Sequence, residues 1–189
     1  TLLKWATDWG MSTRMVGGVI MTHGDDAGLR LPPNLAPKQV VIVPISRKAA
    51  DKEAVMEAAN AVFANLKEAG LRVELDDSEQ KTPGFKFNFW EMKGVPIRIE
   101  VGPKDVANNS VVVARRDVPG KEGKEFGGPM EKEALVQHVN EKLAAIHESM
   151  LTAARQFRDE NIADVSSYEE FKQAIEEGKV SEQARNKYQ

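Results

Sequence analysis

Aromatic, basic and acidic side chains alternate closely between Phe85 and Glu91. Rings stand at positions 85, 87, 89 and 90, with Lys86 among them and Glu91 directly after them. Rings can stack on splayed nucleobases, while lysine and glutamate offer hydrogen-bonding groups to base edges. The pattern therefore favours recognition of a single-stranded RNA. On residue types alone, a core of rings with surface ion pairs remains the alternative.

A second set of charged residues lies in and after the next predicted strand. Apolar residues at 97, 99 and 101 alternate with Arg98 and Glu100, so these two charges share one face. Lys104 and Asp105 follow where that strand ends. Guanine presents two donors, N1–H and N2–H₂, to a carboxylate such as Glu91 or Asp105, and its O6 and N7 accept from Arg98 or Lys104. These residue types are suited to reading guanine.

Composition limits the kinds of protein this chain can be. With 189 residues, 41% apolar and 29% charged, it can form one sizeable globular domain plus an appendage. No apolar run approaches the roughly 18–20 residues of a membrane span, so no membrane partner is expected. The net charge of −3 argues against a general nucleic-acid binder, yet residues 82–116 hold six basic and three acidic side chains. Zero cysteines exclude disulfides and fit a reducing compartment, and we expect a cytoplasmic location.

Hydrophobic periodicity predicts the elements that position these residues. Short apolar runs predict strands at 40–45, 71–75, 97–101 and 111–113. Apolar positions 55, 59, 62 and 66 predict a helix over 51–69, and a short helix is expected over 83–93. A turn-rich stretch over 119–128, interpreted as a flexible hairpin, precedes a long helix and then a short one near 168–175. The apolar stripe of the long helix comprises Leu135, Val139, Leu143, Ile146, Met150 and Phe157. This order predicts an α/β fold with a mixed, mostly parallel sheet flanked by helices.

The N-terminal part is organised differently. Residues 5–10 are expected to end a strand, and Ser12 and Thr13 offer a cap for an apolar helix. Three prolines between 32 and 37 predict a stiff linker over 32–38 and a domain boundary there. His23, Asp25 and Asp26 supply too few ligands for a metal, so we interpret them as a helix end and expect no metal site.

Two long motifs resemble the prolyl-tRNA synthetases, class II enzymes, of the eukaryotic and archaeal type. The run 9–26, with Leu31-Pro-Pro33, resembles motif 3 and the linker after it. The run 82–105, with Ala114-Arg-Arg-Asp117, resembles the anticodon-binding domain. The resemblance implies that residues 1–31 end a catalytic core as a short strand–helix remnant and that 39–128 form an α/β anticodon-binding domain. Residues 129–162 would be a long helix completing or leaving that domain, and 163–189 the truncated start of a C-terminal domain.

The resemblance also implies roles for individual residues. Arg14 matches the motif 3 arginine that grips the ATP triphosphate in catalysis, a role that suits its planar fork. Ser12 matches a position that contacts the nucleotide, and Trp9 and Gly10 match the wall of the proline pocket. Five positions match those that engage the two guanines of the proline anticodon: Phe87, Glu91, Arg98, Lys104 and Asp105.

The implied reaction is the ATP-dependent attachment of proline to tRNA(Pro), with ATP and Mg²⁺ as cofactors of the full-length enzyme. Class II relatives imply a homodimer when the full catalytic core is present. Motifs 1 and 2 would precede residue 1, so this chain by itself is expected not to aminoacylate. Two alternatives remain: a non-catalytic RNA-binding module that keeps the anticodon-binding fold, and an interaction or dimerisation domain.

Overall fold

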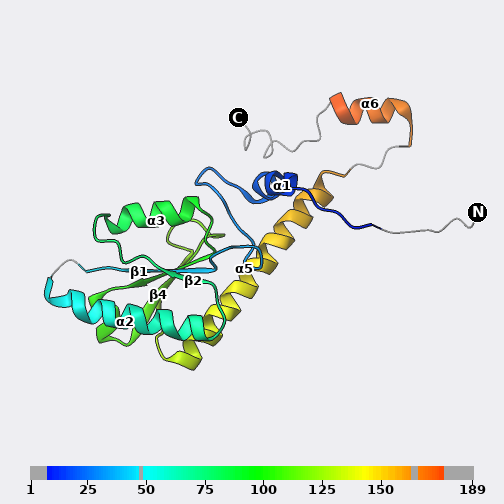
Figure 1. Cartoon of the computed structure of the whole chain (residues 1–189). Helices are drawn as coiled ribbons and strands as arrows, with labels where there is room; N and C mark the ends of the chain where they lie inside the picture. Colours follow the sequence, from blue (N-terminus) through cyan, green and yellow to red (C-terminus); the bar gives the residue numbers. More distant parts are fainter. Residues whose placement is uncertain (1–7, 47–48, 163–165, 177–189) are drawn as a thin grey trace, which may run out of the picture.

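The computed structural model describes residues 8–46, 49–162 and 166–176. Its centre is a five-stranded sheet in the order β2-β1-β3-β4-β5 (Figure 1). The strands are β1 (Val40–Pro44), β2 (Val73–Leu75), β3 (Ile97–Val101), β4 (Ser110–Arg115) and β5 (Lys124–Pro129). The first four lie where the apolar runs predicted them.

The sheet is mixed, as predicted, but parallel pairing does not dominate it. β1 pairs in parallel with β2 and with β3, whereas β3–β4 and β4–β5 are antiparallel. The connection between β3 and β4 holds only the short helix α4 (Pro103–Ala107), which is too short for a parallel crossover. β5 falls in the stretch interpreted as a flexible hairpin. Its glycines and a register shift against β4 explain why periodicity missed it.

Helices cover both faces of the sheet (Figure 1). α2 (Ala49–Glu68) and α5 (Lys132–Glu160) pack on one face, and α3 (Pro83–Met92) packs on the other. β1 shows the alternation that this layering requires, because Val40 and Ile42 join the larger core while Val41 and Val43 lie under Phe87 on α3. The α3 face is the one that carries the charged side chains of β3.

The predicted stripes of the two long helices form most of the larger core. Positions 55, 59, 62 and 66 of α2 are at most 1% exposed. α5 buries Leu135, Val139, Leu143, Ile146 and Met150, but Phe157 is half exposed, contrary to the prediction. A helix of 29 residues is about 43 Å long. Its last turns therefore extend past the sheet and leave Phe157 without a partner layer.

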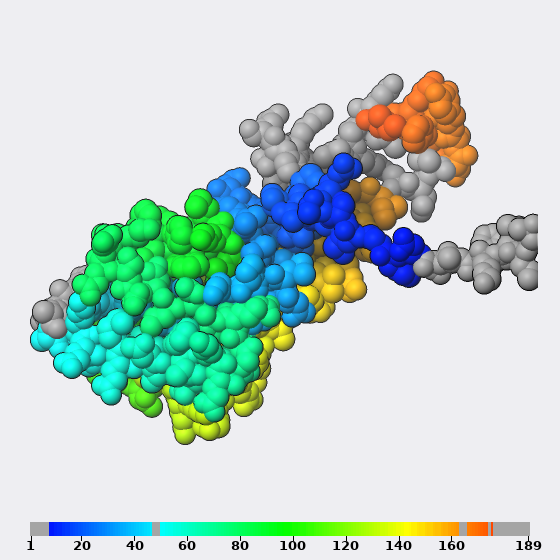
Figure 2. Space-filling view, in the orientation of Figure 1, coloured from blue at the N-terminus to red at the C-terminus, as the bar shows by residue number. Residues whose placement is uncertain are grey.

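The N-terminal segment docks on the rest of the molecule (Figure 2). The helix α1 (Arg14–His23) is present, while residues 5–7 of the predicted strand lie outside the described residues and 8–10 form no strand. After α1, Leu29 N–H donates to the Met92 carbonyl at 2.9 Å and Leu31 N–H to the Gly94 carbonyl at 3.2 Å. Gly94 has φ +75°, and a Cβ there would come within 2.7 Å of Leu29, so the approach requires glycine.

A last helix, α6 (Tyr168–Glu176), lies where the sequence predicted it. None of the helices in the described part of the chain combines the length and hydropathy of a membrane span.

Candidate nucleic-acid interface

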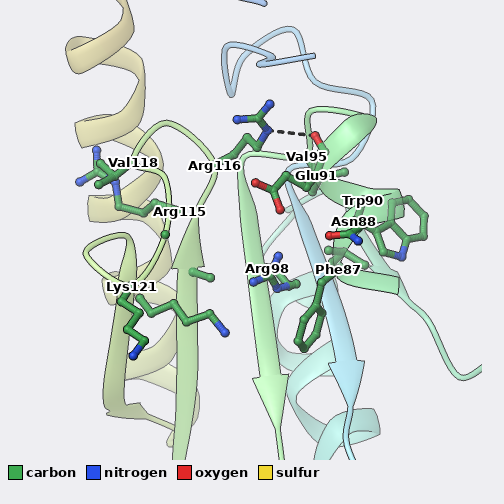
Figure 3. Close-up of a pocket in the computed structure, with 14 residues that line it drawn as sticks. Phe87, Asn88, Trp90, Glu91, Val95, Arg98, Arg115, Arg116, Val118 and Lys121 are labelled. Carbon is green, nitrogen blue, oxygen red and sulfur yellow. Dashed lines mark hydrogen bonds between the residues drawn. The ribbon is translucent and has the colours of Figure 1, made fainter. Parts of the chain in front are cut away.

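A cavity of about 320 Å³ opens beside α3 on the polar face of β3 and β4 (Figure 3). Three of the five residues predicted to read the anticodon line it: Phe87, Glu91 and Arg98. They come from α3 and β3, which follow each other directly in the chain. The remaining wall includes Asn88, Trp90, Arg115, Arg116, Lys121 and Lys124.

Helix α3 presents Phe87 and Glu91 to the cavity from consecutive turns, because residues four apart share a helix face. Its start is defined locally: the Thr82 Oγ1 accepts from the Phe85 N–H at 3.4 Å, and Pro83 occupies the first turn. Gly94, in a left-handed conformation, follows its end. The helix is therefore short and bounded, with the two side chains near its middle and its end.

Arg98 and Phe87 form the floor of the cavity. The Arg98 guanidinium lies 4.2 Å from the centroid of the Phe87 ring. The Glu100 carboxylate, in a residue only 7% exposed, accepts from Arg98 Nε at 3.1 Å and from Lys124 Nζ at 2.8 Å. As predicted, Arg98 and Glu100 share one face of their strand. Glu100 thus holds two cations beside one ring and fixes the Arg98 fork.

Two charged groups of the wall remain available to a ligand. Within the described ranges, no hydrogen bond or ion pair engages the Glu91 carboxylate or the Lys121 ammonium group. Arg115, by contrast, is held by Asp117 through two bonds of 2.9 and 2.6 Å, and this hydrogen bonding raises the pKa of Arg115. The cavity therefore offers one free carboxylate and one free ammonium at opposite sides.

Arg116 connects this wall to the N-terminal segment. Its guanidinium donates to the Asp25 carboxylate at 2.8 and 2.6 Å and to the Glu91 carbonyl at 2.9 Å. Burial by itself raises the pKa of Asp25, but the bonds and charge of Arg116 outweigh it, and the pKa lies below its ordinary value. Asp25, which the sequence analysis interpreted as part of a helix end, is thus the ion-pair partner of the buried Arg116.

Lys104 and Asp105 do not reach this cavity. Both lie on α4 beyond the carboxyl end of β3, where Lys104 is exposed. The Asp105 Oδ2 accepts from the Gly102 N–H at 2.9 Å and so caps its own helix. The structure separates the five predicted residues into a set of three at the cavity and a pair at the strand end.

The residues predicted for ATP and proline lie on the surface of the N-terminal segment. Trp9 is 91% exposed, and Gly10, Ser12 and Arg14 are exposed as well. In the part of the chain that the structure describes, no ion pair involves Arg14. These four positions form no enclosed site among the described residues.

Sequence reasoning missed the basic wall opposite α3. Lys121 and Lys124 lie in the glycine-rich stretch that was interpreted as a hairpin without a role. The only local signal is the recurrence of lysine three residues apart between glycines. Pairing of Lys124 in β5 with Ala114 in β4 carries Lys124 to the cavity, and Lys121 lies in the turn just before β5.

The groups on the cavity wall have the hydrogen-bonding types that could contact a guanine nucleotide. The Glu91 carboxylate can accept from N1–H and N2–H₂, and Arg98 can donate to O6 or N7. The Phe87 ring supplies an apolar surface for a base. Lys121 lies at the exposed rim, where a phosphate would pass.

Comparison with known proteins shows which family the chain resembles. The profile of the family described as "Anticodon binding domain" matches residues 39–142. The chain is 62% identical over 175 residues to the chloroplastic/mitochondrial proline–tRNA ligase of Arabidopsis thaliana, covering 93% of this chain and 32% of that protein. It is 49% identical to the proline–tRNA ligase of Roseiflexus sp. strain RS-1, covering 92% of this chain and 35% of that protein.

A solved structure is similar as well. The crystal structure of prolyl-tRNA synthetase from Cryptosporidium parvum, complexed with L-proline and AMP, matches with a TM-score of 0.79 at 39% identity. The structural match covers 87% of this chain and 34% of the Cryptosporidium parvum chain. The chain thus spans about a third of the length of the relatives it matches. Since the family profile matches more than half of its residues, the protein belongs to the anticodon binding domain family.

Proposed function

We propose that this chain supplies the anticodon-reading domain and the motif 3 segment of a proline–tRNA ligase, which attaches proline to tRNA(Pro) in an ATP-dependent reaction. The family profile and the similarity to proline–tRNA ligases support it. The observation that carries the proposal is the unpaired Glu91 carboxylate beside the Phe87–Arg98 contact, in a cavity of nucleobase size.

In this proposal one anticodon guanine enters the cavity. Its base lies against Phe87, its donors reach Glu91 and its acceptors face Arg98. Lys121 contacts the adjoining phosphate from the rim. Each bidentate base contact of this kind contributes about 1–3 kcal/mol of discrimination, so the site would reject adenine and the pyrimidines.

In the same proposal, Lys104 and Asp105 contact the second guanine beyond the end of β3. Lys104 is exposed and free to reach the O6 or N7 atoms of a base. The Asp105 Oδ2 caps α4, so its second oxygen is the one left for a base. Two separate subsites fit two adjacent, unstacked bases better than one shared cavity does.

The catalytic roles of the N-terminal segment are part of the same proposal. Arg14 and Ser12 offer a guanidinium and a hydroxyl on an exposed surface, which fits part of a triphosphate site. Trp9 and Gly10 would form one wall of a proline pocket whose other walls come from the rest of the enzyme. Among the described residues no three potential metal ligands lie together, so we assign no Mg²⁺ ligand to this chain.

The whole enzyme would use ATP and Mg²⁺ and would form a homodimer through its catalytic core. The sequence predicts a cytoplasmic location, whereas the Arabidopsis thaliana relative is named as a chloroplastic/mitochondrial enzyme. An organellar location therefore competes with the cytoplasmic one. Cell fractionation with an antibody to the chain distinguishes the two.

Binding of an anticodon stem-loop of tRNA(Pro) tests the proposal. The affinity of the chain is compared for the natural loop and for loops in which one or both guanines are inosine, which lacks the 2-amino donor. All titrations use one salt concentration, because phosphate contacts alone vary with salt. We expect replacement of both guanines to weaken binding by about tenfold or more.

Glu91→Gln connects that result to the cavity. The variant should bind the natural loop more weakly but lose little further affinity when the guanine is replaced, since the carboxylate that reads the 2-amino group is gone. Glu122→Gln is the matched control, because Glu122 is exposed outside the cavity and undergoes the same chemical change. Equal binding of natural and inosine loops by the unaltered chain would refute guanine reading.

A further inference from the structure

We infer that Asp76 is a positioning residue for guanine recognition: it fixes the rotation of α3 about its axis and thereby aims Phe87 and Glu91 into the cavity. The inference rests on the proposed function. Asp76 does not line the cavity itself, although its partner Trp90 does, and the sequence marked Asp76 only as the end of a strand. Its position and its partners carry the argument.

The backbone of Asp76 is held by the sheet. It directly follows β2, and its N–H donates to the Ile42 carbonyl at 2.9 Å, which continues the pairing with β1. Its side chain is 12% exposed and turns toward α3. The Oδ1 also accepts from the Ser78 N–H at 3.3 Å, which restrains the carboxylate. Asp76 is therefore a fixed point relative to the strands.

Two side chains of α3 converge on this fixed point. Lys86 donates its ammonium to the Asp76 carbonyl at 2.6 Å and lies 3.2 Å from Oδ1. Trp90 donates its indole N–H to Oδ2 at 2.8 Å. Lys86 is the buried residue of α3, with a side chain 5% exposed. Burying an ammonium group without a counter-charge costs free energy, so the packed position of α3 is stabilised by this contact.

Helix geometry relates the contacts of Asp76 to the positions of Phe87 and Glu91. Lys86 and Trp90 are four residues apart and share one face, and Phe87 and Glu91 follow each of them by one residue. One residue corresponds to about 100° around the axis. Side-chain atoms lie about 5–6 Å from the axis, so a rotation of about 10° would move them by about 1 Å. A shift of that size takes a hydrogen bond of 2.9 Å out of its effective range.

The other end of the helix is held differently. Arg116 binds the Glu91 carbonyl and restrains the last turn, while Phe87 is held by apolar packing on Val41 and Val43 and not by a hydrogen bond. The Thr82 cap restrains only the first turn. Among the described residues, Asp76 is the one acceptor shared by two side chains of α3.

Asp76→Asn tests the inference in the intact 189-residue chain. The amide keeps the shape, but its NH₂ must face either the Lys86 ammonium or the Trp90 indole N–H, and the ammonium loses its counter-charge. Affinity is measured at one salt concentration for the natural anticodon stem-loop and for the loop in which inosine replaces only the guanine whose discrimination Glu91→Gln removes, so that the separate subsite of Lys104 and Asp105 does not contribute to the difference. Each variant is measured well below its own melting temperature. The readout is the ratio of the two affinities, which a general loss of stability does not change.

Asp77→Asn is the matched control, because Asp77 is the next residue in the chain, its side chain is exposed, and the substitution removes the same charge. We expect a ratio of about ten or more for the unaltered chain and for Asp77→Asn, and a ratio near unity for Asp76→Asn. Trp90→Phe keeps both charges and most of the ring while removing one donor, and its ratio should fall between those values.

A ratio in folded Asp76→Asn equal to that of Asp77→Asn would overturn the inference and leave the proposed function intact. If Asp76→Asn does not fold, Trp90→Phe decides: an unchanged ratio contradicts the positioning role. If the unaltered chain shows no discrimination, the proposed function is wrong and the inference is wrong with it.

Discussion

Replacing Asp25 by asparagine is expected to release residues 25–31 from the domain without unfolding the sheet. In the folded protein Asp25 accepts two charge-assisted bonds from Arg116, of 2.6 and 2.8 Å. Asparagine has one acceptor oxygen and places an NH₂ donor against the guanidinium. The Arg116 side chain is 5% exposed and cannot regain both bonds from water while the segment stays docked.

The size of the effect follows from this burial. Hydrogen bonds to charged groups contribute about 1.5–3 kcal/mol each. The Asp25 side chain is 31% exposed, and water screens part of that interaction. We therefore expect the docking free energy to fall by about 1.5–3 kcal/mol in total, or about 10- to 150-fold in the opening equilibrium.

Amide hydrogen exchange measures that opening directly. The Leu29 amide bonds to the carbonyl of Met92, the last residue of α3, and the Leu31 amide to that of Gly94 just after it, so the protection of both amides depends on docking. In Asp25→Asn both amides should exchange about 10- to 150-fold faster, while amides of β3 such as that of Ile99 keep their rates. Asp26→Asn is the control, because Asp26 is exposed and undergoes the same change of charge.

Unchanged exchange at Leu29 and Leu31 would refute the reasoning, since the ion pair would then contribute nothing to docking. Equal acceleration at Ile99 would also refute it, because the variant would have destabilised the whole domain.

Three further predictions concern pH, backbone conformation and salt. The folded pKa of Asp25 lies below its ordinary value, so the contribution of Asp25 to the docking free energy is complete above about pH 4 and is lost as pH falls through the folded pKa. The difference in Leu29 exchange rate between the unaltered chain and Asp25→Asn should therefore shrink below about pH 4. Gly94→Ala should lower stability by about 1–3 kcal/mol in thermal unfolding, because φ is +75° and the new Cβ would meet Leu29 at 2.7 Å. Lys121→Ala should reduce the salt slope of RNA binding by about 1 while guanine discrimination stays constant, and a changed discrimination would contradict the phosphate role.

Much of the fold could be predicted from local patterns. Short apolar runs and alternation located β1 to β4, a 3.6-residue apolar stripe located α2 and α5, and Pro83 and Gly94 bounded α3, because these signals lie in residues a few positions apart. The alternation of rings and charges from 85 to 91 likewise indicated a segment suited to reading RNA. The roles of Phe87, Glu91, Arg98, Lys104 and Asp105 in reading guanine stay predictions.

Local patterns could not predict which distant groups meet. Asp25 and Arg116 are 91 residues apart in sequence, and only the docking of the N-terminal segment joins them. The glycine-rich β5 carries almost no strand signal, yet its pairing with β4 brings Lys124 to Glu100 and Phe87. Asp76 could be interpreted as a strand end but not as the anchor of α3.

The amino-acid sequence by itself thus determined the elements, their buried faces and the residue types available for chemistry, because these depend on side chains a few positions apart. Tertiary structure decided which of those residues share a cavity, which carboxylates are taken up by ion pairs, and which one remains free for a ligand. The physical reason is that strand order and helix packing set distances between residues far apart in the chain, and electrostatic and hydrogen-bonding partnerships depend on those distances.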